Sequence, residues 1–404
     1  MEQSKHRVKI CGSGLAMNTR VHFAERLRSA REFARMSQTE AAAAIGLTSA
    51  ALSQYEAGKR RVDALILEQL ARLYAVPVGY FFGQAVSTPD WETALRDLSK
   101  TLSPAGRTGI ARLIEKIRLL LELLRLTGAP RPKPPHHPFD ALAEKEIAQK
   151  QIAVFAERVR RHYDLGVAPI LNIRAWLEAE GYQVFALSLG QDPDDLSGFF
   201  FWHPELGPVV VVNADQSYSR WPFTLAHELA HSLFHYDRPA VLCRQVDQRP
   251  LERFADQFAS SFLVPQEALL IRLQALNTAH IDTPEQIVHL SRYFGVSYKA
   301  MLRCLEQGDY LGRAPAALSD GVKPIVLARA LGYGPTKLEF GTRPIPIEET
   351  LPRLFIELAY RAVREEKLSL RGAADRLGIS DIELEERLFL EDAQSPEEGC
   401  AEMV

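Results

Sequence analysis

The sequence predicts a multidomain protein that is mainly α-helical and carries one small α+β domain. Its 404 residues exceed the roughly 100–200 residues usual for a single domain, so two or three cores are expected. Helical periodicity dominates both ends of the chain, whereas strand-like runs occur only in the middle, at 182–189, 198–202 and 209–212. Five prolines within residues 129–138 mark an extended spacer between cores. We therefore divide the chain into a tail (1–20), a compact helical module (21–84), a helical connector with its Pro-rich linker (85–139), a middle domain (140–312), a helical C-terminal domain (320–392) and a second tail (393–404).

Composition and charge are those of an ordinary globular protein. Hydrophobic residues make up 47% and charged residues 25% of the chain, and the formal net charge is −3, so any nucleic-acid surface must be a local patch. The four cysteines lie far apart, which argues against a disulfide framework and fits a reducing cytoplasm. No apolar run reaches the roughly 18 residues that a membrane span needs, so we expect a cytoplasmic protein with no membrane partner.

Residues 21–84 predict a domain of five short helices that contains a helix-turn-helix. Ser37 and Glu40 have the spacing of a capping box at the start of the second helix, and Gly46 stands at the turn that ends it. A third helix then begins at Thr48. Its place directly after this turn is typical of a recognition helix.

The outward face of the third helix carries small and polar side chains that suit the major groove of DNA. Hydroxyl and amide groups there can read base edges, and small residues let the helix approach closely. We expect Gln54 to be the main base reader, while Gln38 and the basic run 59–61 contact phosphates. The predicted DNA contacts are Gln38, Thr48, Ser49, Ala50, Ser53, Gln54, Lys59, Arg60 and Arg61.

Residues 23–83, with the segment SQTEAAAAIGLTSAALSQYEAGKRR, resemble the Cro/repressor or XRE class of helix-turn-helix domains. The resemblance implies binding to double-stranded operator DNA. Because such operators are usually two-fold symmetric, it also implies a homodimer. The alternative is an XRE-like domain used for protein contacts.

A leucine-rich stripe in the connector bears on dimerisation. Leu113, Ile117, Leu120 and Leu124 recur at heptad-like spacing within a helix predicted at about 106–126. The stripe either forms a dimer seam or packs on its own domain, and the sequence leaves both alternatives open.

A second group of residues has the spacing of a zinc site. In the segment HELAH, His227 and His231 lie one helical turn apart and can share a zinc ion, while Glu228 beside them can polarise a water molecule. Twenty-one residues after His231, Glu252 can complete the ligand set and leave one position open for water. Asp256 follows on the same helical face and can accept the Nδ1 proton of a ligand histidine, most simply His227. The pattern predicts a gluzincin-type site with one zinc ion per chain.

The surrounding residues 197–265 resemble the ImmA/IrrE family of zinc metallopeptidases, and the likeness extends from about 142 to about 311. It is carried by the segments SGFFFW, PVVVVN, RWPFTLAHELAHSLFH and ERFADQFASSFLVP. The resemblance implies a zincin-like fold in which the two histidines and the second glutamate hold zinc and Glu228 is the general base. It also implies that Gly198–Trp202 is the edge strand beside the cleft, where an extended peptide can add as a further strand.

Several further histidines and tyrosines lie near these motifs. We interpret His235 as a buried, hydrogen-bonded histidine in the wall of the site and not as a ligand. We interpret the histidines at 136–137 and His203 as solvated side chains. Tyr218 and Tyr236 are candidate oxyanion donors that the sequence does not separate.

The C-terminal domain contains a segment, 368–388, that also has the shape of a helix-turn-helix. Its second helix would repel phosphate, because it carries Asp381, Glu383, Glu385 and Glu386. We therefore expect a structural or regulatory role for this segment.

Together the motifs predict a DNA-binding transcriptional regulator with a fused zinc metallopeptidase domain. The resemblance implies a protein substrate, either an XRE-type repressor or the chain's own connector, whose cleavage would switch gene expression. One alternative is a non-cleaving regulator whose peptidase-like domain senses a ligand or stress signal. Another is an antitoxin-like operon regulator.

Overall fold

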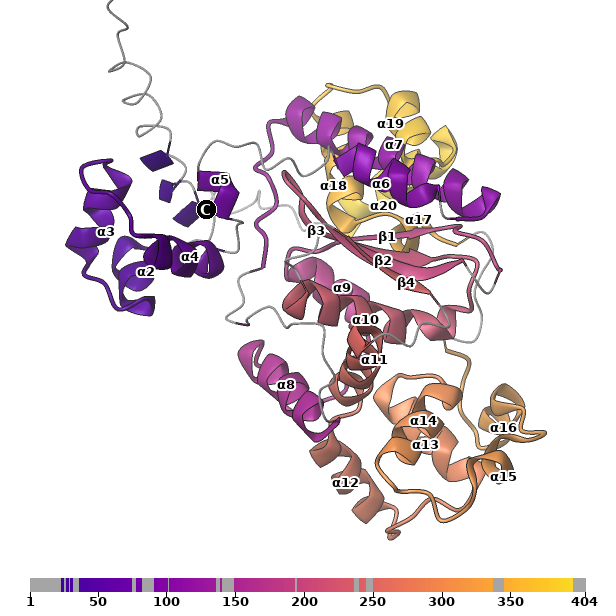
Figure 1. The fold of residues 1–404 in the computed structure, drawn as a ribbon. Coiled ribbons are helices and arrows are strands. Elements are labelled where there is room, and N and C mark those ends of the chain that lie inside the picture. The colour runs from indigo at the N-terminus through magenta and orange to yellow at the C-terminus, as the bar shows by residue number, and fades with distance from the viewer. Residues whose placement is uncertain are drawn as a thin grey trace, which may run out of the picture. The chain divides into compact units, whose positions relative to one another are not determined.

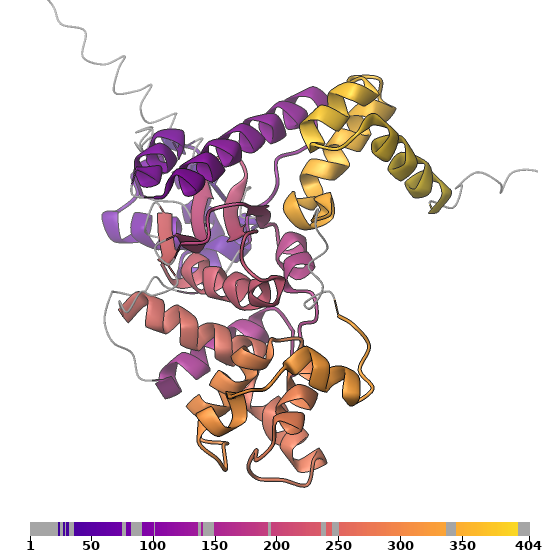
Figure 2. The same ribbon diagram turned by 90° about the vertical axis from the view of Figure 1, so that its right-hand side faces the viewer.

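The computed structural model of the 404-residue chain comprises two compact units. One unit contains residues 1–94 and 133–140, and the other contains residues 95–132 and 141–404. Figures 1 and 2 show the chain in two views. The structure describes residues 23–24, 27–28, 30–31, 36–74, 78–81, 91–100, 102–135, 139, 149–192, 195–235, 240–244, 250–336 and 345–394.

The N-terminal unit is a small helical domain whose described helices are preceded by helical residues between 23 and 31. Ser37 and Glu40 cap α2 as a capping box, and the left-handed Gly46 (φ 70°) turns the chain toward α3, which Thr48 caps. Both features were predicted. Its core is apolar and draws on all of the helices, which are α2 (Gln38–Ala44), α3 (Ser49–Glu56), α4 (Ala64–Leu73) and α5 (Val78–Phe81).

A buried ion pair locks this small core. The Arg31 guanidinium donates to both carboxylate oxygens of Glu56, at 2.6 and 3.0 Å, and to the carbonyl oxygen of Met36 at 2.7 Å. The amide nitrogen of Gln38 donates to the same carboxylate at 2.8 Å. Both carboxylate oxygens of Glu56 thus accept hydrogen bonds from donors within the domain.

The larger unit is built around a four-stranded sheet with the strand order β1-β3-β2-β4. Strand β1 pairs parallel with β3, whereas β2 runs antiparallel to both β3 and β4. The valines of β3 are completely buried, as expected for a central strand with both faces covered. The strands are β1 (Gln183–Leu187), β2 (Leu196–His203), β3 (Gly207–Asn213) and β4 (Ala240–Arg244).

The sheet corrects one expectation. Gly198–Trp202 was predicted to be an edge strand, but it lies within β2 and is paired on both sides, with Phe199 opposite Val211 of β3 and opposite Leu242 of β4. The edge next to β2 is occupied by β4, which was not predicted from the sequence.

Helices cover both faces of the sheet (Figures 1 and 2). The helices α9 (Ile173–Ala179) and α10 (Trp221–Phe234) pack on one face, and α7 (Pro104–Thr127) lies over the other. Residue 109 of α7 is glycine because the helix touches the chain that follows β1. A Cβ there would lie 2.3 Å from the carbonyl oxygen of Ser188.

The leucine stripe of α7 is covered by the chain itself. Leu113, Ile117 and Leu120 are fully buried and Leu124 is 6% exposed, and α7 packs along α18 (Arg353–Arg364). The structure therefore favours packing within the domain over a dimer seam. The segment predicted as a connector also forms part of the larger unit, since residues 95–132 group with it.

A buried arginine and a half-buried lysine attach the C-terminal helices to this unit. The guanidinium of Arg174 donates to the carbonyl oxygens of Glu349 and Leu351, and Lys116 of α7 donates to the carbonyl oxygen of Arg376 at 2.6 Å. These helices are α17 (Ile347–Thr350), α18, α19 (Leu370–Leu377) and α20 (Asp381–Gln394).

The remaining helices lie on the α10 side of the sheet. They are α8 (Gln149–His162), α11 (Pro250–Leu263), α12 (Gln266–Ala275), α13 (Pro284–Phe294), α14 (Tyr298–Gln307), α15 (Pro315–Ser319) and α16 (Pro324–Ala330). The short 3₁₀ helix η1 (Tyr218–Arg220) leads into α10, and α6 (Trp91–Ser99) precedes α7. Among the described helices, none is long and apolar enough to cross a membrane.

Candidate metal centre

Helix α10 places the predicted ligands deep inside the larger unit. Pro222 stands in its first turn, where a missing N–H costs nothing, and every residue from Thr224 to Phe234 is buried. Such a helix buries its polar residues only if they have partners. His227 is 7% exposed, and Glu228 and His231 are completely buried.

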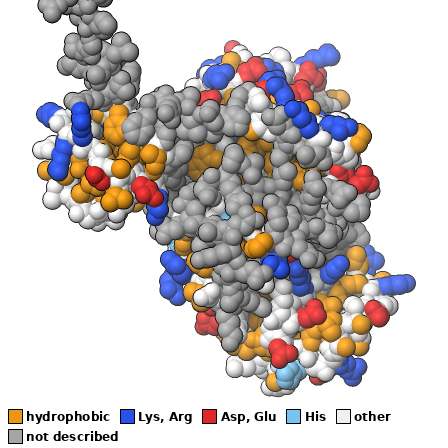
Figure 3. Space-filling model, in the orientation of Figure 1, with side chains coloured by type: hydrophobic (Ala, Val, Ile, Leu, Met, Phe, Trp, Pro, Cys, Tyr) orange, Lys and Arg blue, Asp and Glu red, His pale blue; other side chains and the backbone are white. Residues whose placement is uncertain are grey.

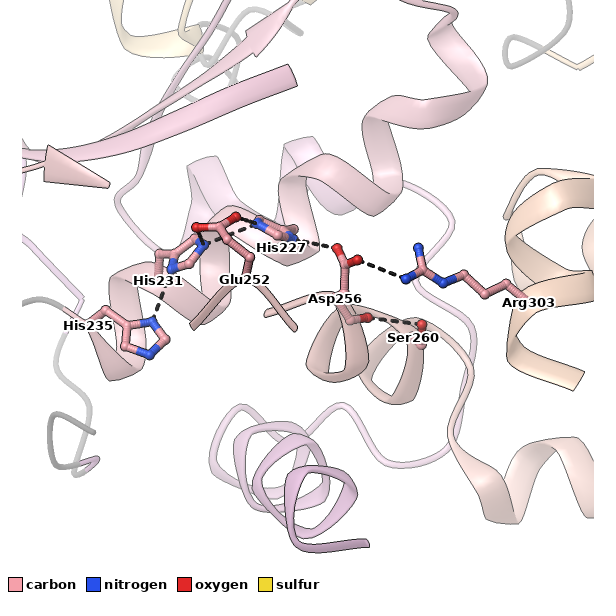
Figure 4. Close-up of polar contacts among 7 residues, drawn as sticks. All are labelled: His227, His231, His235, Glu252, Asp256, Ser260 and Arg303. Atoms are coloured by element: carbon pink, nitrogen blue, oxygen red, sulfur yellow. Dashed lines mark hydrogen bonds and ion pairs between the residues drawn. The ribbon is translucent and has the colours of Figure 1, made fainter. Parts of the chain in front are cut away.

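The donor atoms of His227, His231 and Glu252 converge on one point (Figure 4). The two histidine Nε2 atoms lie 3.1 Å apart, and the Glu252 carboxylate oxygens lie 3.2 Å from Nε2 of His227 and 3.7 Å from Nε2 of His231. Bonds of about 2.0–2.1 Å to zinc would place tetrahedral ligand atoms roughly 3.3 Å apart. These three residues form a group within the described part of the chain that could hold a metal ion.

The electrostatics of the cluster agree with a cation site. Burial alone would lower the pKa of His227, but hydrogen bonds to Asp256 and Glu252 outweigh it and raise that pKa to about 10. Burial would likewise raise the pKa of Glu252, yet hydrogen bonds from both histidines hold it well below its usual range. The carboxylates of Asp256 and Glu252 thus stabilise a positive charge at this position, as they would stabilise a divalent cation.

Asp256 lies beside His227, as the residue spacing predicted. Its Oδ1 is 3.0 Å from Nδ1 of His227, and its Oδ2 accepts a hydrogen bond of 2.9 Å from Arg303 of α14 (Figure 4). The Asp256 carbonyl also accepts from the Ser260 hydroxyl at 3.0 Å. Arg303 was not predicted from the sequence, because it is 47 residues away from the aspartate along the chain.

His235 is buried as expected for a wall histidine, but it does more than fill space. Its side chain is 2% exposed, and its Nδ1 lies 3.0 Å from Nδ1 of His231. This contact was not predicted from the sequence.

Gly198 of β2 makes room for the general-base candidate. A Cβ at this position would lie 2.7 Å from Cγ2 of Thr224, 2.8 Å from the carbonyl oxygen of Val211 and 3.0 Å from Oε1 of Glu228. The strand therefore approaches α10 closely enough to touch the Glu228 carboxylate. The glycine in the segment SGFFFW was a signal that could have indicated this approach.

Among the other residues singled out from the sequence, one has different surroundings from those expected. His203 was expected to be solvated, but it is completely buried, and its Nδ1 accepts hydrogen bonds from the N–H groups of Glu205 and Leu206 at 3.1 Å. The Tyr218 ring stacks near Trp221. The expectations for Tyr236 and the histidines at 136–137 lie outside the described residues.

The predicted DNA contacts are mostly on the surface of the N-terminal unit. Thr48, Ala50, Ser53 and Gln54 are exposed along α3, as are residues 59–61. Figure 3 shows Lys and Arg side chains on the visible face of this unit. Ser49 is half-buried, and Gln38 is engaged by the Glu56 carboxylate as described above.

Comparison with protein families gives two matches. Residues 22–79 match a helix-turn-helix domain, and residues 177–306 match an IrrE N-terminal-like domain of the M78 peptidases. The second match contains His227, Glu228, His231 and Glu252.

Curated relatives match a short part of the chain. An uncharacterized HTH-type transcriptional regulator, y4wC, of Sinorhizobium fredii is 41% identical over 61 residues, which is 15% of this chain and 43% of the relative. A similar regulator of Sinorhizobium medicae is 34% identical over 65 residues, 16% of this chain and 47% of the relative. The chain thus spans less than half the length of these relatives.

Solved structures add little. The crystal structure of Bacillus thuringiensis PlcR in complex with the peptide PapR7 and DNA is 12% identical, with coverage of 92% and 93% of the two chains, but its TM-score is 0.16. ComR from Streptococcus suis has a TM-score of 0.15. Scores this low carry no argument about this chain.

Proposed function

We propose that this chain, which matches a helix-turn-helix domain and an IrrE N-terminal-like domain, is a DNA-binding transcriptional regulator whose second domain hydrolyses peptide bonds with one bound zinc ion. The observation that carries the proposal is the convergence of two histidine Nε2 atoms and a carboxylate beside buried Glu228.

The chemistry of the donor set favours zinc. Two imidazoles and one carboxylate are a catalytic zinc ligand set that leaves a fourth position open, whereas structural zinc sites are closed by four protein ligands. Zinc held there supplies a Lewis acid that lowers the pKa of a bound water to about 7.

Glu228 is the group proposed to move the proton. It follows His227 directly on α10 and lies in the same buried space, so its carboxylate can take a proton from the attacking water and pass it to the leaving amine nitrogen. The absence of a side chain at Gly198 lets the neighbouring strand lie close to this carboxylate. Asp256 fixes the tautomer of His227 by accepting its Nδ1 proton.

The proposed substrate is a protein, either an XRE-type repressor or the chain's own Pro-rich connector. An extended segment would add to the free side of β4, because β4 and not β2 is the edge strand on that side of the sheet. Cleavage of a repressor, or of the link to the helix-turn-helix domain, would change transcription.

On the DNA side, the exposed face of α3 is proposed to enter the major groove. Gln54 and Ser53 offer an amide and a hydroxyl to base edges, and residues 59–61 offer cations to phosphates. Two copies of the domain on a two-fold operator would make the protein a homodimer.

The test compares wild type with Glu228→Gln, which preserves the shape of the side chain but removes its basic oxygen. Each zinc-loaded protein is incubated with a panel of XRE-type repressors and with the chain's own fragment 1–140, and products are identified by mass spectrometry. We expect one defined cleavage by wild type and none by Glu228→Gln at equal zinc content. Cleavage by both proteins at the same rate would contradict the role of Glu228.

A second candidate function is a non-cleaving regulator in which the same domain senses a ligand. The complete burial of Glu228 and His231 favours it, since hydrolysis requires a peptide to reach them. If wild type binds zinc and DNA but cleaves no member of the panel, this alternative replaces the peptidase proposal.

A further inference from the structure

The Nδ1 atoms of His227 and His231, the two proposed ligand histidines, contact chemically different groups. Nδ1 of His227 faces the Asp256 carboxylate, which Arg303 also binds, whereas Nδ1 of His231 faces the imidazole of His235 (Figure 4). A histidine that binds metal through one nitrogen needs a partner at the other to fix its tautomer and orientation. For His231, the partner seen in the structure is His235.

We propose that His235 is a positioning residue that accepts the Nδ1 proton of His231 and so directs the Nε2 lone pair of His231 toward the metal. The proposal rests on the proposed zinc site and extends it to a residue outside the ligand set.

Proton accounting supports a single arrangement. If Nε2 of His231 binds metal, this nitrogen carries no proton, and the proton of the neutral ring lies on Nδ1. That proton points at Nδ1 of His235, 3.0 Å away, which must then be the acceptor. The opposite arrangement would put a proton on Nε2 of His231 and block the metal position.

The backbone fixes His235 relative to the same residue. His235 is the C-cap residue directly after α10, and its N–H donates to the carbonyl oxygen of His231 at 2.9 Å. Its ring packs edge-on against Phe254 of α11, with ring centres 5.5 Å apart. Backbone, ring contact and side-chain hydrogen bond therefore all place the Nδ1 acceptor beside His231.

His235 is not a fourth ligand in this geometry. Its Nδ1 is engaged with His231, on the side of that ring away from Glu252 (Figure 4). The described ligand group contains only His227, His231 and Glu252.

Two substitutions distinguish a positioning role of His235 from a space-filling role. The two roles predict opposite orders of zinc affinity for the two variants. His235→Asn loses ring volume but keeps an acceptor, since the amide oxygen can occupy the place of Nδ1. His235→Phe keeps the volume and the contact with Phe254 but has no acceptor. Zinc affinity of the full chain is measured by competition with a chromophoric chelator, and folding is followed by circular dichroism on the same samples.

We expect His235→Phe to bind zinc about 10–100-fold more weakly than wild type, the range found for lost outer partners, and His235→Asn to stay within a few-fold. The absorption spectrum of the cobalt-loaded protein should change with Phe and be preserved with Asn. The proposal is overturned if His235→Phe binds zinc like wild type or if His235→Asn is the weaker binder. Should the Phe variant fail to fold, an affinity loss in His235→Asn alone would also overturn it. Absence of zinc binding by wild type would instead refute the metal site itself.

Discussion

The two units of the protein place charged groups in opposite ways. In the helix-turn-helix unit the buried charges of Arg31 and Glu56 form an ion pair, and the groups proposed to bind DNA lie mostly on the surface. In the larger unit the buried groups at His227, His231 and Glu252 point their donor atoms at one another. The Arg31–Glu56 pair is neutralised within its own domain, whereas the three convergent donor groups could hold a metal ion. The two buried clusters therefore differ in whether their polar atoms pair off or converge on one point.

The largest stability effect is expected from breaking the Arg31–Glu56 pair. Glu56→Ala leaves the Arg31 guanidinium buried without its partner, which typically costs about 3–5 kcal/mol. Hydrogen exchange of the amides in 38–73 should rise strongly, while zinc content stays unchanged. Glu68→Ala is the matched control, since its ion pair with Arg72 is exposed and should contribute under about 1 kcal/mol. Equal effects of the two variants would remove the distinction between a buried and an exposed pair.

The next effect concerns a buried histidine that needs no cation. Burial lowers the pKa of His203 from 6.5 to about 4, and its Nδ1 accepts two N–H groups of the β2–β3 turn. The unfolded chain therefore binds this proton more readily than the folded one, so stability falls as the pH is lowered from 6.5 to 4, by roughly 3 kcal/mol.

Thermal unfolding of wild type and His203→Asn across this range measures the effect. The amide oxygen of asparagine can accept the same N–H groups but does not titrate, so the variant should show a flatter pH dependence. Identical profiles for the two proteins would show that His203 is not the titrating group.

Substitutions on the exposed face of α3 should change DNA recognition without unfolding the domain. Gln54→Ala is expected to cost about 1–3 kcal/mol of discrimination at one base pair, measured by anisotropy on a site selected by wild type from random duplexes. Arg61→Ala should weaken binding to all sequences and reduce the salt slope by about 1. Gln69→Ala, exposed on α4, is the control. No change with Gln54→Ala would exclude α3 as the reading helix.

A buried site should instead respond to small packing changes. Gly198→Ala places a methyl group against Thr224, the Val211 carbonyl and Glu228, which should cost about 1–3 kcal/mol of stability. We also expect slower cleavage at unchanged zinc content, because the proton acceptor is displaced and the ligands are not. Wild-type stability and cleavage in this variant would argue against the close approach of β2.

The smallest effect is expected at the rim of the metal centre. Arg303 is half exposed, so Arg303→Ala should weaken zinc binding only a few-fold, within about 1 kcal/mol. Asp256→Ala, which removes the direct partner of His227, should weaken it about 10–100-fold. A chelator competition in which Arg303→Ala binds zinc more weakly than Asp256→Ala would contradict this order.

Local patterns in the sequence predicted most of the elements that carry these sites. The capping box at Ser37, the turn at Gly46 and three of the four strands follow from short-range spacing and alternation, and the structure contains them. The ligand set follows from helical periodicity plus one spacing, and the three donors do lie together.

The features that were missed depend on contacts between distant parts of the chain. Strand β4 has only five residues and pairs with β2 across some forty positions, so no local pattern marks it. The burial of His203 depends on how the hairpin folds over its ring, although the flanking turn suggested solvent. Residue spacing alone places His235 on a helix but does not show that its ring meets His231.

The zinc content of the purified protein tests the proposed metal site. Wild type, Glu228→Gln and Glu252→Ala are purified, incubated with excess zinc, desalted and measured by inductively coupled plasma mass spectrometry, with circular dichroism confirming folding. We expect about one zinc per chain in wild type and in Glu228→Gln, and little in Glu252→Ala, since only the last loses a proposed ligand. Folded wild type without zinc, or equal zinc in all three proteins, would contradict the proposed site.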